Sequence, residues 1–380
     1  MLENFLKKNF DMRYSMKQII KGVPHIYQKK SSFCHYASLA MIFRYYGIDV
    51  TIDEVLHDIG AGHAFVYQFP FLFDISSFYE TSNMKFLSEI YGVSYKDIRP
   101  KIKVDKDKCW KKCWSDIKYY IKKNIPIECS IDPNVLEYNK NNRKETKERG
   151  GHFVVITGYD EHKDGQVFFK DPNLPIEENR DGKSISISKR VFRQAVEQTI
   201  GNKYWLRVFE KKSNPYNIKE RNFRAHERNM NLMKGISSTY EKKLKPGVKF
   251  GVKGLKLLKN DLRPENIAMR LPIYKINDRF VRISCISELE NFLTVTAKTY
   301  EIISDKKNTV SNYSMINSNE SSLLKKEGDF WSELCEIAAE IGEKNVIRSY
   351  RSVYSSKNMF EEMREIVDKI IKIEENIISQ

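Results

Sequence analysis

The stretch at residues 21–51, KGVPHIYQKKSSFCHYASLAMIFRYYGIDVT, places one cysteine at the start of an apolar run. Apolar side chains at helical spacing predict a buried helix over residues 34–46, and Gly47 suits its C-terminal cap. A free cysteine is most often a small buried apolar residue. Cys34 would nevertheless lie at the amino end of this helix, where the helix dipole favours a thiolate. The stretch alone leaves a buried residue, a metal ligand and a nucleophile open.

A cysteine nucleophile needs a base and a group that orients this base, and two later segments supply both. His152 begins the strand-like run HFVVITGYD directly after two glycines, and Asp171 ends the next run, VFFKD. A turn between the runs predicts a hairpin, in which Asp171 would lie beside His152 and orient it. Gln28 can donate an amide hydrogen bond to an oxyanion, together with the backbone N–H of Cys34. The pattern predicts Cys34 as nucleophile, His152 as base, Asp171 as orienting acid and Gln28 in the oxyanion hole.

Three blocks carry a family resemblance: VPHIYQKKSSFCHYASLAMIFRYYG, GGHFVVITGYD and VFFKDPN. They resemble the C39-like branch of the papain-fold cysteine proteins. In that family a cysteine is the nucleophile, a histidine the base, an aspartate orients the histidine, and a glutamine helps to form the oxyanion hole. The resemblance implies the same roles for Cys34, His152, Asp171 and Gln28. The family usually has glycine after the cysteine, whereas this chain has His35, a side chain that we expect to narrow the cleft or touch the acyl group.

A narrower resemblance covers CHYASLAMIFRYYGIDVTIDEVLHDIGAGHAFVY, which is similar to the butirosin-biosynthesis protein H group. That group has a cysteine helix, a glycine-containing loop and a helical C-terminal half, and DFWSELCEIAAEIG with the last predicted helix fits this outline. The resemblance implies acyl transfer from a carrier-protein thioester through acyl-Cys34 to an amine. We expect His35, Gly62 and His63 to line the substrate site, since neither histidine has an obvious acid to orient it.

Two domains are expected within an α+β fold. Residues 1–210 combine helices with short antiparallel strands and predict a papain-like core, with the cysteine on a helix and His and Asp on the sheet. Residues 211–380 predict a basic, mainly helical domain that ends in a long amphipathic helix. Residues 305–328 are polar and predict a loose loop between its helices.

The remaining cysteines give no disulfide framework, because the chain is long and no secretory signal is apparent at its start. Cys109 and Cys113 are one helical turn apart, but no second pair of ligands lies at metal spacing nearby. We favour two helix-face cysteines beside Trp110 and Trp114, and we expect no metal or cofactor. Phosphopantetheine would enter only as part of the carrier-protein substrate.

Charge is uneven along the chain, whose formal net charge is +15. Residues 211–259 hold 14 lysines and arginines against 3 acids, which favours an acidic partner, although a solvated basic surface is the simpler interpretation. We predict an acidic acyl or peptidyl carrier protein and an amine acceptor as partners, with no nucleic acid and no membrane. We also predict a cytoplasmic location. The alternative function is a cysteine peptidase or amidase that uses the same residues with water as the acceptor.

Overall fold

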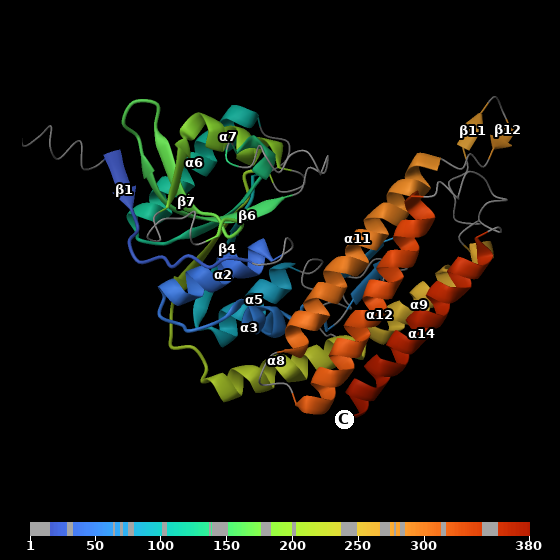
Figure 1. The fold of residues 1–380 in the computed structure, drawn as a ribbon. Coiled ribbons are helices and arrows are strands. Elements are labelled where there is room, and N and C mark those ends of the chain that lie inside the picture. Colours follow the sequence, from blue (N-terminus) through green and yellow to red (C-terminus); the bar gives the residue numbers. More distant parts are fainter. Residues whose placement is uncertain are drawn as a thin grey trace, which may run out of the picture. The chain divides into compact units, whose positions relative to one another are not determined.

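A computed structural model gives the fold of the chain (Figure 1). It describes residues 16–28, 33–63, 65–68, 71–74, 80–100, 105–136, 138, 151–175, 184–199, 203–236, 249–266, 274–276, 279–281, 286–312, 317–343 and 356–380.

Two compact units divide the chain. The first comprises Met1–Val55 and Met84–Tyr216, and the second comprises Leu56–Asn83 and Asn217–Gln380. The expected division after residue 210 differs from this packing at one segment, because Leu56–Asn83 packs with the C-terminal residues. The reason is apolar burial: Phe65 and Tyr67 of this segment belong to the core of the helical unit.

An antiparallel sheet forms the centre of the first unit. Its strands run in the order β4-β9-β5-β6-β7-β8, and β1 pairs with β6. Their bounds are Lys17–Ile19 (β1), Val93–Ile98 (β4), Ile127–Ile131 (β5), His152–Asp160 (β6), Gln166–Lys170 (β7), Ile185–Ser188 (β8) and Leu206–Lys211 (β9). The mixture of helix with antiparallel sheet confirms the predicted α+β class.

The predicted hairpin is formed by β6 and β7, which pair antiparallel from Val155 opposite Lys170 to Asp160 opposite Gln166. The register shifts by one residue between Ile156 and Gly158, which is a β-bulge. A Cβ atom on Gly158 would lie 2.6 Å from the backbone oxygen of Gln18 on β1. Glycine is therefore required for the close approach of β1 to β6 at this bulge.

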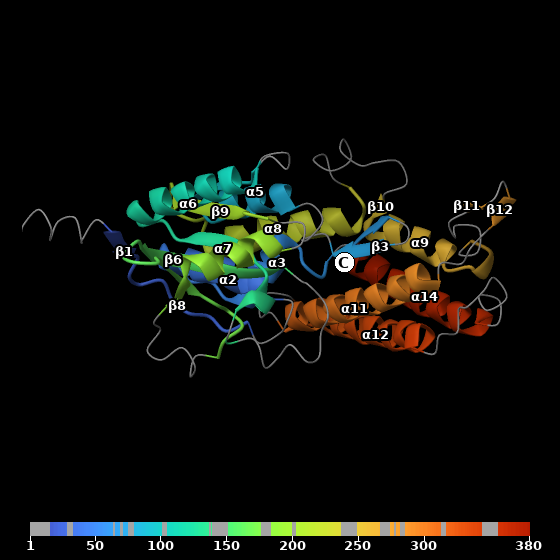
Figure 2. The same cartoon turned by 90° about the horizontal axis from the view of Figure 1, so that it is seen from above.

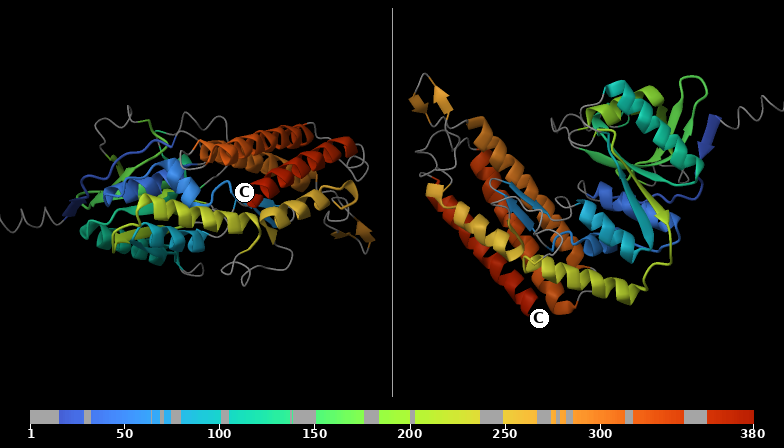
Figure 3. Two further views of the ribbon diagram at one scale, coloured as in Figure 1. Left: turned by 90° about the horizontal axis from the view of Figure 1, so that it is seen from below. Right: turned by 180° about the vertical axis from the view of Figure 1, so that it is seen from behind.

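Three helices cover this sheet: α2 (Cys34–Tyr45) lies on one face, and α6 (Lys106–Lys122) and α7 (Lys189–Gln198) lie on the other (Figures 1 and 3). Residues 34–43 of α2 are all buried, as its apolar sequence predicts. Gly47 follows the helix with φ of +79°, a conformation in which glycine carries no Cβ penalty. The cysteine helix thus packs directly on β6, the strand that begins with His152.

Two helices cross the boundary between the units, α3 (Ile52–Ile59) and α5 (Glu80–Ile90). Thr51 caps α3, since its Oγ1 accepts a hydrogen bond from the N–H of Glu54 at 3.2 Å. The Glu54 carboxylate in turn accepts from the N–H of Thr51 at 2.7 Å. This reciprocal pair is a capping box, which fixes the start of α3.

Helices dominate the second unit (Figure 2). Its helices are α8 (Ile218–Met233), α9 (Gly251–Asp261), α11 (Ile286–Ser311), α12 (Ser318–Glu343) and α14 (Lys357–Ser379), and its strands are β2 (Phe65–Gln68), β3 (Phe71–Asp74), β10 (Lys249–Phe250), β11 (Tyr274–Ile276) and β12 (Arg279–Val281). Trp331 is fully buried at the centre of their shared core. In the part of the chain that the structure describes, no helix combines the length and the apolar character needed to cross a bilayer.

The prediction of a loose loop over residues 305–328 is wrong, because most of this segment belongs to α11 and α12. Two of its charged residues, Lys307 and Glu327, belong to a buried ion-pair cluster. The Lys307 ammonium lies 2.6 Å from Glu327 and 3.1 Å from Glu374 on α14, and all three side chains are fully buried. In the sequence alone, charged residues that form ion pairs inside a helical core cannot be told from charged residues of a solvent-exposed loop.

Candidate active site

Cys34 is the first residue of α2 and is 8% exposed. The backbone N–H of Phe153 donates a hydrogen bond to its sulphur, and the side chain of His152 bonds the same atom. The first N–H groups of a helix have no partner within the helix, so the Cys34 sulphur lies at a local concentration of positive partial charge. The structure thus brings the predicted nucleophile and the predicted base into direct contact.

His152 also contacts the predicted orienting acid. Its Nε2 lies 2.6 Å from Oδ1 of Asp171, so Nδ1 is the ring nitrogen left for Cys34. Asp171 is held by two further donors, the backbone N–H of Asn173 at 2.8 Å and the hydroxyl of Tyr138 at 2.6 Å. The hairpin therefore produces the contact that the sequence predicts, and Tyr138 adds a donor that the sequence did not indicate.

The charges of these groups favour a thiolate–imidazolium pair. Burial alone raises the pKa of Cys34, but the hydrogen bond and charge of His152 and the Phe153 N–H outweigh it, so that the pKa falls below its usual value. Burial lowers the pKa of His152, but the charge and hydrogen bond of Asp171 raise it well above its usual value. Burial raises the pKa of Asp171, but the charge and hydrogen bond of His152, together with the hydrogen bonds from Tyr138 and Asn173, bring it below its usual value. Both shifts move the Cys34–His152 pair toward a thiolate beside a protonated imidazole.

Gln28 lies beside the residues that follow Asp171. Its backbone N–H donates to the carbonyl of Pro172 at 2.8 Å, and its side-chain amide donates to Oδ1 of Asn173 at 3.4 Å. The residue is 3% exposed. These contacts connect Gln28 to the loop that carries the orienting acid, while its role in an oxyanion hole stays a prediction.

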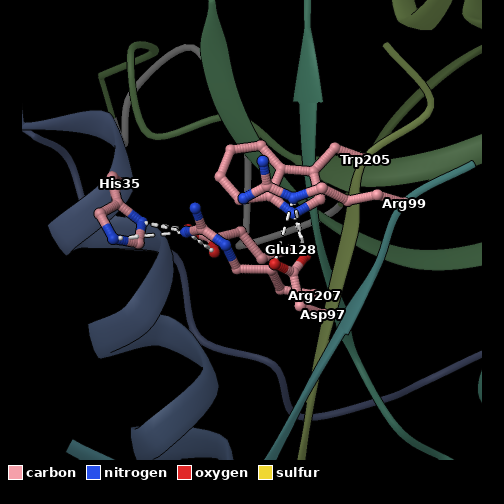
Figure 4. Close-up of polar contacts among 6 residues, drawn as sticks. All are labelled: His35, Asp97, Arg99, Glu128, Trp205 and Arg207. Atoms are coloured by element: carbon pink, nitrogen blue, oxygen red, sulfur yellow. Dashed lines mark hydrogen bonds and ion pairs between the residues drawn. The ribbon is translucent and has the colours of Figure 1, made fainter. Parts of the chain in front are cut away.

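His35 has an acid partner, so the expectation that it lacks one is wrong. Its Nδ1 lies 2.6 Å from Oε1 of Glu128, and Figure 4 shows the ring directed from α2 toward Glu128 and Arg207. His35 is 9% exposed, so most of its surface is engaged in this cluster rather than available to line a substrate site. The reason is the geometry of a helix, since successive side chains point about 100° apart around its axis.

Glu128 and Arg207 are buried residues that the sequence analysis missed. They are direct partners in the pairing of β5 with β9, and Arg207 Nη1 donates to Oε2 of Glu128 at 2.9 Å. Burial raises the pKa of Glu128 well above its usual value, to which the charges of Cys34 and Asp97 contribute, and burial lowers the pKa of Arg207 well below its own. A single charged residue in each of two apolar strands, PIECSI and WLRVF, was the signal available in the sequence.

Gly62 and His63, two of the predicted lining residues, belong to the second unit. A Cβ atom on Gly62 would lie 3.2 Å from the backbone of Lys306. His63 is fully buried, and its ring packs edge-on against His57 with centroids 5.5 Å apart. Burial lowers the pKa of His63 well below its usual value, and surrounding cations add to this. Their role in lining the site stays a prediction.

The other described cysteines lie in packed surroundings. Cys109 and Cys113 are buried beside Trp110 and Trp114, whose rings stack with centroids 5.6 Å apart. Burial raises the pKa of the Cys113 thiol. Among the residues that the structure describes, no group of three or more ligand side chains is placed to hold a metal ion. Cys34 is thus distinguished from Cys113 by the direction in which its surroundings shift the pKa.

Comparison with known families agrees with this geometry. Residues 20–204 match the model of the Peptidase_C39 like family. The match supports a papain-like, C39-like family for this part of the chain, and it covers Cys34, His152 and Asp171. No curated protein matches the chain with significant similarity. The findings support a cysteine-type enzyme, and the likeness to the butirosin-biosynthesis protein H group stays a prediction.

Proposed function

We propose that this protein is a cysteine acyltransferase, which moves an acyl group from a carrier-protein thioester through acyl-Cys34 to an amine. The observation that carries the proposal is the buried contact chain from Cys34 to His152 to Asp171. This chain supplies a thiolate nucleophile and a proton donor in one site, and a thioester is a substrate that such a pair attacks readily.

Each half-reaction uses the same two groups. The Cys34 thiolate attacks the thioester carbonyl, the bond from carbon to the carrier sulphur breaks, and His152 gives its proton to the leaving thiolate. The amine then attacks the acyl-Cys34 carbonyl, neutral His152 takes the amine proton, and Cys34 leaves as a thiolate. In both tetrahedral intermediates the backbone N–H of Cys34 and the amide of Gln28 would bind the oxyanion.

Carrier docking draws support from exposed lysines in the second unit. Several basic residues of the 211–259 stretch form ion pairs within this unit, as Lys256 does with Glu375 at 2.8 Å. The positive charge that this stretch offers to a partner is therefore smaller than the charge counted from its sequence. Lys249 on β10 and Lys253 in the first turn of α9 are exposed. We propose that they attract an acidic carrier protein, whose association would weaken with salt.

Intact mass after incubation with an acylated carrier tests the transfer. We expect an acyl adduct on the wild-type protein, its absence in Cys34→Ala and its retention in Cys335→Ala, a matched cysteine control on α12. When an amine is added, the acyl group should be released as the amide faster than as the free acid. A protein that forms no adduct from any thioester but cleaves peptides would refute the transfer and leave the cysteine peptidase or amidase as the function.

Charge reversal tests the docking surface. The double variant Lys249→Glu/Lys253→Glu should slow transfer from the carrier and flatten its salt dependence, with no change in transfer from a short pantetheine thioester. Lys108→Glu/Lys111→Glu on α6 alters the charge equally at exposed positions of the first unit and should leave carrier transfer unchanged. Equal effects of the two double variants would contradict the proposed surface.

A further inference from the structure

A buried polar cluster lies directly beneath the first turn of α2. His35 follows Cys34 in the sequence, its Nδ1 lies 2.6 Å from Glu128, and Glu128 accepts from Arg207 at 2.9 Å. Glu128 is fully buried and Arg207 is 1% exposed. Arg207 Nη1 also lies 3.1 Å from Nδ1 and 3.4 Å from Nε2 of the His35 ring. The Glu128 and Arg207 side chains therefore hold the ring in one orientation.

Aromatic packing continues from this cluster to Phe153. The ring of Phe153 lies 5.0 Å from the His35 ring, 4.9 Å from the Arg207 guanidinium and 5.6 Å from the Trp205 ring. Trp205 is in turn held by its indole N–H, which donates to Asp97, and by the Arg99 guanidinium at 3.7 Å from the ring centroid (Figure 4). Phe153 is half-buried, and one side of its ring thus contacts groups whose positions are themselves fixed by hydrogen bonds and ion pairs.

Phe153 also takes part in the proposed active site through its backbone. It directly follows the base His152, and its N–H donates to the Cys34 sulphur. A shift of the Phe153 ring would move this N–H and the adjoining His152 relative to the thiolate. Phe153 therefore links the buried cluster to the two reacting side chains.

We propose that His35 is a positioning residue: anchored by Glu128, its ring fixes Phe153 and thereby holds the Phe153 N–H and His152 on the Cys34 sulphur. The inference rests on the proposed function only in taking Cys34 as the nucleophile. It gives a role to the one residue of the cysteine motif that departs from the glycine of the resembling family. The His35 side chain thus stabilises the arrangement of Cys34 and His152 from the buried side of α2.

His35→Leu tests this role by a change that leaves the neighbouring charges in place. The charged groups that face Cys34 are His152, Asp171 and Glu128, and all are retained in the variant. The readout is the rate at which iodoacetamide alkylates Cys34 between pH 5 and 10, followed by mass spectrometry of the peptide that contains it. We expect the thiol pKa to rise by about one and the rate at pH 7 to fall about tenfold.

Two further variants separate positioning from mere stability. His35→Asn keeps a donor near the position of Nδ1 but lacks the ring, so it should regain thermal stability while alkylation stays slow. Val196→Ala removes methyl groups from the fully buried face of α7, so it should lower the melting temperature and leave the alkylation profile unchanged. An Asn variant with wild-type alkylation would refute the link through Phe153.

A double-variant cycle with Phe153→Leu completes the test. If His35 acts through Phe153, each single change slows alkylation about tenfold and the double variant is slowed about tenfold as well, not about a hundredfold. Independent, multiplying effects would overturn the inference, as would a folded His35→Leu protein with the wild-type profile. If Cys34 of the wild-type protein reacted no faster than Cys335, the proposed function would fail, an outcome distinct from either of these.

Discussion

Replacing Asp171 by asparagine should remove most of the thiolate character of Cys34 at acid pH. The Asp171 carboxylate is 1% exposed and lies 2.6 Å from Nε2 of His152. Two unit charges whose centres are about 4 Å apart interact by about 4 kcal/mol at an effective dielectric constant of about 20. Part of this is recovered by the amide dipole and by relaxation, so we expect the pKa of His152 to fall by about 2, equivalent to about 3 kcal/mol.

This change reaches the nucleophile because His152 holds the proton that Cys34 gives up. When the pKa of His152 falls by about 2, the thiolate–imidazolium pair loses about 100-fold in population relative to the neutral pair. Alkylation of Cys34 by iodoacetamide at pH 6 should slow by about the same factor. The asparagine carbonyl oxygen can still accept from the Asn173 N–H, and the amide NH2 can donate to the Tyr138 hydroxyl oxygen, so the fold should be retained.

The assay needs a control for net charge. Asp164→Asn changes the charge equally in the exposed turn between β6 and β7, and it should leave the alkylation rate unchanged. Near-ultraviolet circular dichroism of both variants establishes that the tertiary structure is intact. An Asp171→Asn protein that is folded and alkylated at the wild-type rate at pH 6 would refute the reasoning, because Cys34 would then be ionised without help from the Asp171 charge.

Three further predictions follow from the same contacts. The pKa of Cys34 is lowered and that of His152 is raised. Turnover should therefore rise with pH at a pH below the usual thiol pKa and fall at a pH above the usual imidazole pKa, as initial rates measured from pH 4 to 10 would show. A single rise near pH 9 would contradict the ion pair. Tyr138→Phe removes a 2.6 Å hydrogen bond to the orienting carboxylate and should slow turnover about tenfold, the equivalent of about 1.5 kcal/mol; an unchanged rate would show that this donor is dispensable. Lys307→Met leaves two fully buried carboxylates without their cation and should lower the free energy of unfolding by about 3 to 5 kcal/mol in urea titrations, whereas the exposed Lys326→Met should leave it unchanged.

Local patterns accounted for the cysteine helix and the hairpin. The apolar run after Cys34 specifies a buried helix, and the turn between two alternating runs specifies which strands pair. Once those strands pair, the contact between His152 and Asp171 follows from short-range geometry. These features could be predicted because each depends on residues that are near one another in the sequence.

Contacts across the sheet and across the helical core could not be predicted in this way. Glu128 and Arg207 are opposite one another only because β5 pairs with β9, and Lys307 meets its two carboxylates only after three helices have packed. In the sequence each is a charge in an apolar strand or in a polar segment. The misassigned loop at residues 305–328 and the misjudged His35 have this same origin.

The sequence by itself determined the helix that begins at Cys34 and the contact between His152 and Asp171, because both are set by local periodicity and by one tight turn. Only the tertiary structure decided where His35 points, since its partners come from strands about 90 and 170 residues away along the chain. The physical reason is that a buried charge is stable only beside its counter-charge, and the fold alone brings those charges together. The residue that seemed in the sequence to face the substrate therefore faces the core.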